Sequence, residues 1–122
     1  MQKPRVLVVE DEALIRALIV ETLIDAGFDV EEAGNSDSAA RMLEADGYRL
    51  LVTDVHMPGA LDGIGLARLA HVTDPQMPVI VVTGRPDVLG RLNGSGIRGT
   101  SLAKPFKVAE LVRVVSRFVR PA

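Results

Sequence analysis

The chain has 122 residues, of which 48% are hydrophobic and 25% are charged, as expected for one globular domain with a substantial core. Its net charge of −2 and the lack of a Lys/Arg cluster argue against nucleic-acid binding, and the absence of cysteine excludes disulfides, thiolate metal sites and cysteine nucleophiles. With neither a signal peptide nor an apolar run of membrane-spanning length, we expect a single cytoplasmic domain over residues 1–122 that has no membrane partner.

The first predicted strand covers residues 5–9 (RVLVV) and is almost wholly apolar, as strands are in a parallel sheet covered on both faces. Three successive acids follow it, beginning at Glu10. Asp11 could cap the helix predicted over residues 13–26, but three acids exceed what a cap requires. That helix ends at Gly27, which suits a left-handed cap.

The predicted helix over residues 13–26 is apolar over more than half of its circumference. Four residues at helical spacing predict its buried face: Ile15, Leu18, Ile19 and Leu23. A second apolar stripe lies on another side and consists of Ala13, Ala17, Val20 and Ile24. A surface helix does not need this stripe, so it is either a docking face for a partner or apolar surface that water tolerates.

The middle of the chain continues the alternation of strand and helix. Alternating residues at 28–33 predict a half-exposed edge strand, and a helix is predicted over 36–44. The run LLVTD, which ends at Asp54, predicts a buried strand. A glycine-bearing loop over 59–63 then precedes a helix that begins at residue 64.

The apolar run VIVV predicts another buried strand over residues 79–82. Four glycines between residues 90 and 99 disfavour regular structure, so any helix over 87–92 should be short and loosely held. A last strand over 100–103 and a last helix over 107–119 complete five strand–helix repeats.

Right-handed crossovers between parallel strands make this pattern a three-layer α/β sandwich. The carboxyl ends of all five strands then lie at one edge, where open α/β sheets keep their functional sites. The side chains that follow or end these strands are Glu10, Asp11, Asp54, Thr83 and Lys104.

Three carboxylates directed at one place repel each other and need a cation. Since no histidine or cysteine is among them, a hard ion bound through oxygen, above all Mg²⁺, is the natural candidate. A lysine and a threonine hydroxyl beside such an ion are the groups that a phosphoryl group requires. An ionised aspartate can itself act as the nucleophile and form an acyl phosphate.

From Val6 to Phe118 the chain resembles the receiver domains of two-component response regulators. The resemblance rests on VVEDE after the first strand, DVHMPG with Asp62-Gly63 after the third, PVIVVTG for the fourth and LAKPF for the fifth. The separations between the acid, aspartate, threonine and lysine positions (54 − 11 = 43, 83 − 54 = 29, 104 − 83 = 21) also agree with the family. The resemblance implies a flavodoxin-like (βα)5 fold with a five-stranded parallel sheet in the order 2-1-3-4-5.

The resemblance also implies a role for each site residue. Asp54 would accept a phosphoryl group from a sensor histidine kinase or histidine phosphotransferase, and a downstream protein target, not named by the sequence, would read the result. Glu10, Asp11, Asp54 and the main-chain carbonyl of His56 would hold Mg²⁺. The phosphoryl group would contact Thr83, Gly84 and Lys104, and the bond before Pro105 would be cis.

The chain departs from the family pattern in places. Ser101 stands where many members carry an aromatic residue, so there is no ring to move on activation, although a shift of Thr83 could still move the loop that follows it. The loop from Asp54 to Gly63 is one residue longer than in the most familiar members. His56 and Arg85 occupy variable positions that tune phosphoryl lifetime in the family.

Alternative functions remain open at this point. The chain could be a stand-alone receiver that acts by protein binding or phosphorelay and catalyses only its own phosphorylation and dephosphorylation. It could also be a receiver from a hybrid histidine kinase or a longer regulator. An aspartyl-phosphate hydrolase is disfavoured because His56 stands where such enzymes carry a second carboxylate. We expect Leu14, Ala17, Val20 and Ile24 to dock the phosphodonor, and the loop over 85–94 to carry output.

Overall fold

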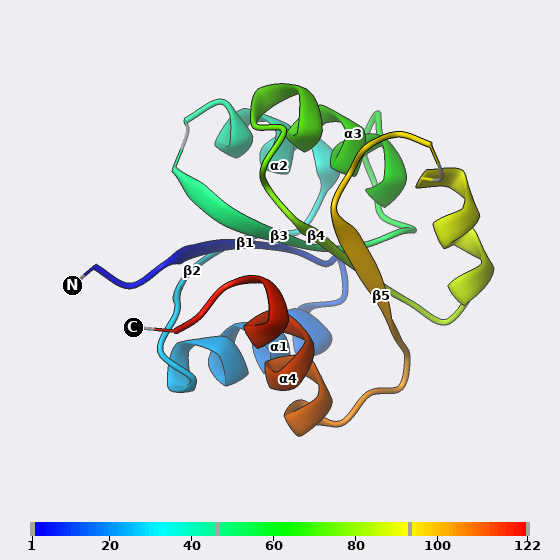
Figure 1. Cartoon of the computed structure of the whole chain (residues 1–122). Coiled ribbons are helices and arrows are strands. Elements are labelled where there is room, and N and C mark those ends of the chain that lie inside the picture. The colour runs from blue at the N-terminus through cyan, green and yellow to red at the C-terminus, as the bar shows by residue number, and fades with distance from the viewer. Residues whose placement is uncertain (1, 46, 93, 122) are drawn as a thin grey trace.

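A five-stranded parallel sheet lies between two layers of helices in the computed structural model, which describes residues 2–45, 47–92 and 94–121 (Figure 1). The strand order is β2-β1-β3-β4-β5, which confirms the predicted fold and strand order. The elements are β1 (Arg5–Val9), α1 (Ala13–Asp25), β2 (Asp29–Ala33), α2 (Ser36–Leu43), β3 (Tyr48–Asp54), α3 (Gly63–Thr73), β4 (Val79–Thr83), η1 (Pro86–Leu92), β5 (Gly99–Ala103) and α4 (Val108–Phe118).

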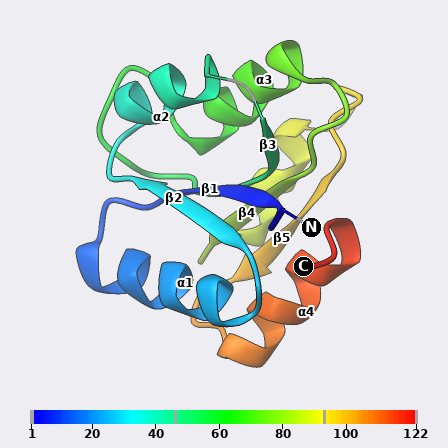
Figure 2. The same ribbon diagram turned by 90° about the vertical axis from the view of Figure 1, so that its left-hand side faces the viewer.

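Helices α1 and α4 cover one face of the sheet, and α2 and α3 cover the other (Figure 2). Each face has its own apolar core, the first around Ile19, Leu23 and Leu111, the second around Ile64 and Leu66. The central strands are buried along nearly their whole length, whereas β2 and β5 at the edges are partly exposed. Within the described residues, no helix has the length and apolar character needed to cross a membrane.

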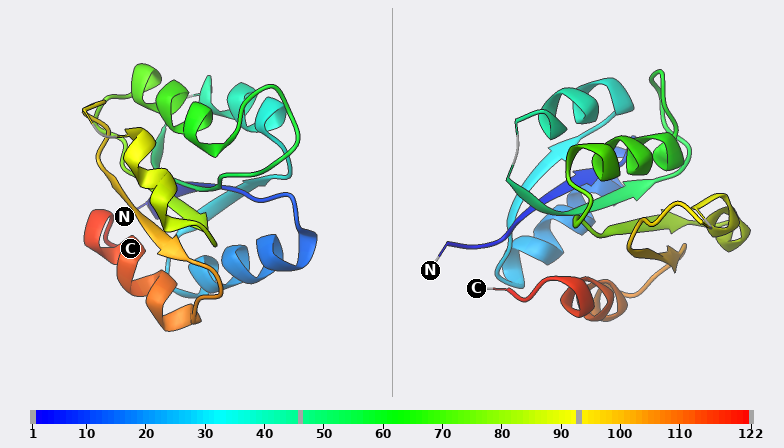
Figure 3. Two further views of the ribbon diagram at one scale, coloured as in Figure 1. Left: turned by 90° about the vertical axis from the view of Figure 1, so that its right-hand side faces the viewer. Right: turned by 45° about the horizontal axis from the view of Figure 1, so that its top comes forward.

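The connection between β4 and β5 differs from the other crossovers because it contains a 3-10 helix, η1, in place of an α-helix (Figure 3). Gly94 and Gly96, which follow η1, have positive φ angles of 78° and 81°. This agrees with the expected short and weakly formed helix, since glycine disfavours helical continuation. The predicted output loop over 85–94 includes residue 93, and the predicted domain includes residues 1, 46, 93 and 122, all outside the described residues.

Helix α1 turns a different face to the core than its sequence pattern predicted. Val20 is only 8% exposed and packs in the core between the sheet and α4, so its assignment to an exposed docking stripe was wrong. Leu18, predicted to be buried, is 43% exposed. The reason is that α1 contacts both the sheet and the neighbouring α4, which rotates the buried face toward Val20.

One of the three acids after β1 does stand at the N-cap of α1, although it is not the one considered above. Glu12, not Asp11, occupies the N-cap position, and its side chain makes no capping hydrogen bond. Asp11 therefore remains exposed in the bend between β1 and α1. At the other end of the helix, Gly27 adopts a φ of 103°, as its predicted left-handed cap position requires.

Candidate functional site

Three carboxylates meet at the carboxyl edge of the sheet. Glu10 follows β1 directly, and Asp54 is the last residue of β3, the strand that pairs with β1. Together with Asp11 they each offer a ligand oxygen, and these oxygens all lie within 4.8 Å of one another. Parallel neighbouring strands end at the same edge, so the positions of these residues at strand ends place them in the same region of the sheet.

Lys104 joins this cluster from the far edge of the sheet. Its Nζ donates to Glu10 Oε1 at 2.7 Å and to Asp54 Oδ2 at 3.1 Å. The Lys104 backbone amide donates to the Thr83 carbonyl at 2.9 Å, and the Lys104–Pro105 peptide bond is cis. The ammonium group thus bridges two carboxylates that would otherwise repel each other.

Glu10 is the most buried of the acids, with 1% of its surface exposed. Burial raises the pKa of Glu10 to about 7, helped by the neighbouring Asp54 and opposed by the hydrogen bond from Lys104. Burial alone would lower the pKa of Lys104, but its hydrogen bonds to Glu10 and Asp54 outweigh burial and raise that pKa. The site therefore favours a positively charged lysine between the two acids.

The main chain around Asp54 is held closely by the start of α3. Asp54 Oδ1 accepts a hydrogen bond from the Val55 amide at 2.7 Å, and the Gly63 amide donates to the Val55 carbonyl at 2.7 Å. A Cβ atom on Gly63 would lie 1.9 Å from the Asp54 carbonyl oxygen, so only glycine fits this position. This contact explains physically why a glycine begins α3 here.

The adjoining Asp62 connects α3 to η1. Its Oδ1 caps α3 by accepting from the Gly65 amide at 2.8 Å, and its Oδ2 lies 2.9 Å from Arg91 Nη2. Burial would raise the pKa of Asp62, but these partners outweigh burial and lower it. Arg68 Nη2 also donates to the Arg91 carbonyl at 2.8 Å, so η1 is attached to α3 at two points.

Thr83 ends β4 beside β3 and is 2% exposed. Its Oγ1 accepts a hydrogen bond from the Arg85 amide at 3.0 Å, while Gly84 between them is exposed. Ser101 lies one strand further out, paired with Val81, and His56 has an exposed side chain two residues after Asp54. Thr83, Gly84 and His56 thus lie at strand ends or in the loops that follow them, whereas Ser101 lies in the middle of β5.

The donor atoms of the acidic cluster suit a hard divalent cation. All three side chains offer carboxylate oxygen, the ligand that Mg²⁺ prefers. In addition, Glu10 Oε2 is buried and has no hydrogen-bond partner among the described residues. A cation or its bound water would satisfy that oxygen, so the residues present fit a Mg²⁺ ion.

One contact at this edge was not predicted from the sequence. Arg16, one turn into α1, donates from Nη1 to the Glu10 carbonyl at 2.7 Å. Its position among apolar helix residues offered no signal of this role, because the partner is a main-chain atom.

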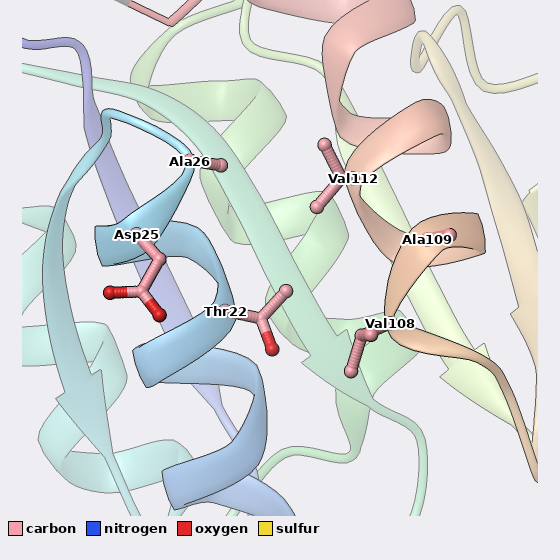
Figure 4. Close-up of a pocket in the computed structure, with 6 residues that line it drawn as sticks. All are labelled: Thr22, Asp25, Ala26, Val108, Ala109 and Val112. Carbon is pink, nitrogen blue, oxygen red and sulfur yellow. The ribbon is translucent and has the colours of Figure 1, made fainter.

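An apolar groove of about 330 Å³ lies beside the cluster, lined by Ile15, Leu18, Lys104, Pro105 and Phe106. A second groove, of about 380 Å³, lies between α1 and α4 and is lined by Thr22, Asp25, Ala26, Val108, Ala109 and Val112 (Figure 4). Lys104, which contacts two carboxylates of the cluster, lines the first groove but not the second, so the first groove is the neighbour of the site.

The predicted docking residues are only partly available for docking. Leu14 is 87% exposed, Ala17 is exposed and Ile24 is 46% exposed, whereas Val20 is buried. Leu18 adds exposed apolar surface next to the groove beside Lys104. The accessible apolar face of α1 therefore excludes Val20 and includes Leu18, which lines the groove together with Lys104.

Comparison with known proteins gives the same family over almost the whole chain. The family model for the response regulator receiver domain matches residues 6–116. The response regulator receiver protein CpdR of Brucella abortus is 34% identical over 116 residues, which cover 94% of this chain and 96% of that protein. Three other curated relatives are longer, and this chain spans between 25% and 53% of their length.

Two solved structures are close in fold. The chemotaxis protein CheY4 of Vibrio cholerae superposes with a TM-score of 0.87 at 25% identity, covering 97% of this chain and 100% of that chain. The response regulator TrrA of Thermotoga maritima, solved in complex with Mg²⁺-BeF, gives a TM-score of 0.84 at 27% identity and covers 95% and 99% respectively.

Proposed function

This chain belongs to the response regulator receiver family, and we propose that it accepts a phosphoryl group on Asp54 from a phosphohistidine donor. The observation that carries the proposal is the meeting of Glu10, Asp11, Asp54 and Lys104 at one edge of the sheet. An aspartate with acidic neighbours and a bridging lysine suits phosphoryl transfer, in which charge must be neutralised on the moving group.

In the proposed reaction, a carboxylate oxygen of Asp54 attacks the phosphorus atom of phosphohistidine. The new O–P bond forms as the P–N bond breaks, and the imidazole leaves with the electron pair and takes up a proton. Lys104, already 3.1 Å from Asp54 Oδ2, would then pair with a phosphoryl oxygen. Thr83 Oγ1 accepts from the Arg85 amide, which leaves its hydroxyl proton to be donated to another phosphoryl oxygen.

Mg²⁺ would be held by Glu10, Asp11, Asp54 and the His56 main-chain carbonyl, and it would supply positive charge to the phosphoryl oxygens. The Mg²⁺-BeF complex of TrrA supports this assignment by analogy. Water would later hydrolyse the acyl phosphate, with His56 and Arg85 at the rim of the site. The chain would thus catalyse only its own phosphorylation and dephosphorylation.

We assign the phosphodonor to the apolar face of α1 nearest the site. Leu14 and Leu18 are exposed there, and the groove lined by Ile15, Leu18 and Phe106 opens beside Lys104. A helix that carries phosphohistidine could lay apolar side chains on this face while its imidazole reaches Asp54. A sensor histidine kinase or a histidine phosphotransferase provides such a helix.

Output then goes to a downstream protein, by binding or by phosphorelay. The longer relatives are regulators, and they support as the alternative that this receiver acts within a larger regulator. A receiver from a hybrid histidine kinase is the other form of this alternative. An aspartyl-phosphate hydrolase has less support, because the residue two positions after Asp54 is His56 and not a carboxylate.

Labelling with acetyl phosphate tests the proposal. In the presence of Mg²⁺, the wild-type chain should gain one hydroxylamine-sensitive phosphoryl group, and Asp54→Asn should gain none, as read by intact-protein mass spectrometry. Asp25→Asn, an equivalent change at an exposed position of α1, should label like wild type. Labelling of Asp54→Asn at the wild-type level would overturn the assignment.

A further inference from the structure

The turn that carries Glu10 and Asp11 needs support from outside β1. The Glu10 amide donates to the Ala33 carbonyl of β2 at 3.1 Å, which fixes one side of this residue. Beyond Glu10 the chain leaves the sheet, and Glu12 at the N-cap of α1 makes no side-chain capping bond. The direction in which the Asp11 side chain leaves the turn therefore depends on how the Glu10–Asp11 peptide is held.

Arg16 holds that peptide from the first turn of α1. Its Nη1 donates to the Glu10 carbonyl at 2.7 Å, and its Nε donates to Glu32 Oε1 at 3.0 Å. The Arg16 side chain is only 23% exposed, so water does not replace these bonds easily. A hydrogen bond from a charged donor to a main-chain carbonyl is stronger than one between neutral groups.

The surroundings leave room for this guanidinium. A Cβ atom on Gly34, just after β2, would lie 3.0 Å from Arg16 Nη1 and 3.7 Å from Arg16 Cζ. A side chain there would push the guanidinium away from the Glu10 carbonyl. The ends of β1 and β2 and the start of α1 thus meet around one arginine.

We infer that Arg16 is a positioning residue for the divalent-cation site: by holding the Glu10 carbonyl, it orients the Glu10 and Asp11 carboxylates toward Asp54. The inference rests on the proposed function, since it concerns the same metal site. Groups that orient metal ligands through hydrogen bonds typically change metal affinity by about 10- to 100-fold when they are replaced. Arg16 does this through the main chain and needs no contact with the ion.

The positive charge of Arg16 and its positioning of the ligands should have opposite effects on Mg²⁺ affinity. Arg16 is a cation close to a cation site, so its removal by itself should tighten Mg²⁺ binding. Loss of ligand orientation should weaken that binding. A weaker affinity in a variant without the guanidinium would therefore report orientation and not charge.

The test is calorimetric titration of the full chain with Mg²⁺ alone, below the unfolding temperature of every variant. Arg16→Gln should raise the dissociation constant for Mg²⁺ about tenfold. Arg16→Lys should recover part of the lost affinity, because an ammonium group can still reach the Glu10 carbonyl. Glu32→Gln, which removes the ion pair but keeps the bond to the Glu10 carbonyl, should stay within about twofold of wild type because an exposed charge is screened.

A kinetic readout separates positioning from general damage. In acetyl phosphate labelling, Arg16→Gln should need about tenfold more Mg²⁺ for half-maximal rate, yet approach the wild-type rate at saturating Mg²⁺. Equal or tighter Mg²⁺ binding by both Arg16 variants would overturn the inference while leaving the proposed function intact. If the wild-type chain itself bound no Mg²⁺, the metal site of the proposed function would fail, and this inference with it.

Discussion

Lys104 shows how one side chain opposes the effect of burial on the pKa of a neighbouring acid, Glu10. It lies between Glu10 and Asp54, of which Glu10 is the more buried, and it contacts both. Burial raises the pKa of Glu10 to about 7 in the folded chain, compared with the ordinary value of 4.5 in the unfolded chain. The folded state therefore loses stability relative to the unfolded state as the pH rises through this range.

Replacing Lys104 by Ala should raise the pKa of Glu10 above its wild-type value. The hydrogen bond from Lys104 lowers that pKa, and its loss leaves Glu10 with burial and the Asp54 charge, which both raise it. A ¹³C NMR titration of the Glu10 carboxyl carbon measures the change.

The Lys104→Ala variant should accept a phosphoryl group from acetyl phosphate but show smaller changes in amide chemical shift on phosphorylation than the wild-type chain. The reason is that no ammonium group pairs with the new negative charge.

Thr83→Ala serves as the graded control for this prediction. It should reduce the phosphorylation-dependent amide shifts more mildly than Lys104→Ala and leave the Glu10 pKa unchanged. A Lys104→Ala protein with wild-type shifts on phosphorylation would show that Lys104 does not read the phosphoryl group.

Among the elements, α1 carries apolar side chains on two different sides. Its inner side packs on the sheet and α4 through Ile19, Val20 and Leu23, and Arg16 supports the turn before it. Its outer side leaves Leu14 exposed close to the site. Helix α1 is thus apolar on more than one side because one side packs in the core and another is exposed. Burial in the core does not explain why residue 14 is an apolar leucine.

Charges on the open face of α1 should slow transfer from a phosphohistidine donor. Leu14→Glu and Leu18→Glu should each reduce the transfer rate by about fivefold or more, since the loss of an apolar anchor at an interface typically costs about 1 kcal/mol or more. The smaller Ala17→Glu change should also slow it. The measurement uses a phosphorylated sensor kinase that labels the wild-type chain.

Two controls accompany this prediction. Acetyl phosphate should label all three variants at the wild-type rate, because the acidic cluster is unchanged. Ile24→Glu lies at the far end of the helix and should have a weaker effect on kinase transfer. Equal slowing with both donors would point to damaged folding or chemistry, and no slowing with either would mean that the face is ordinary surface.

At the scale of the whole molecule, one sheet is shared by two apolar cores. Every buried strand contributes side chains to both faces, as Leu7 and Val8 of β1 do to opposite sides. Damage to either core should therefore weaken the same sheet. The assignment of residues 1–122 to a single receiver domain remains a prediction that this coupling can test.

Leu111→Ala on one face and Ile64→Ala on the other should each lower the free energy of unfolding by about 2–5 kcal/mol, the usual cost of a cavity at a fully buried site. Urea unfolding should stay a single transition when followed by Tyr48 fluorescence and by far-UV circular dichroism. Separate midpoints for the two probes would argue against one cooperative domain.

The sequence by itself determined the order of elements, the parallel sheet and the edge at which the acids meet. Those features follow from local patterns: apolar runs of strand length, helical spacing and the rule that parallel strands end together. Asp54 and Glu10 could be placed from such patterns because each directly ends or follows a predicted strand.

Only the tertiary structure decided which side chains touch. Lys104 reaches Glu10 across 94 positions of sequence, and no local pattern encodes the distance between them. The burial of Val20 depends on where α4 packs against α1, and the role of Arg16 depends on a main-chain carbonyl brought beside it by the turn after β1. Such contacts arise from the relative placement of packed elements, because periodicity shows which face of an element is apolar but not which neighbour covers it.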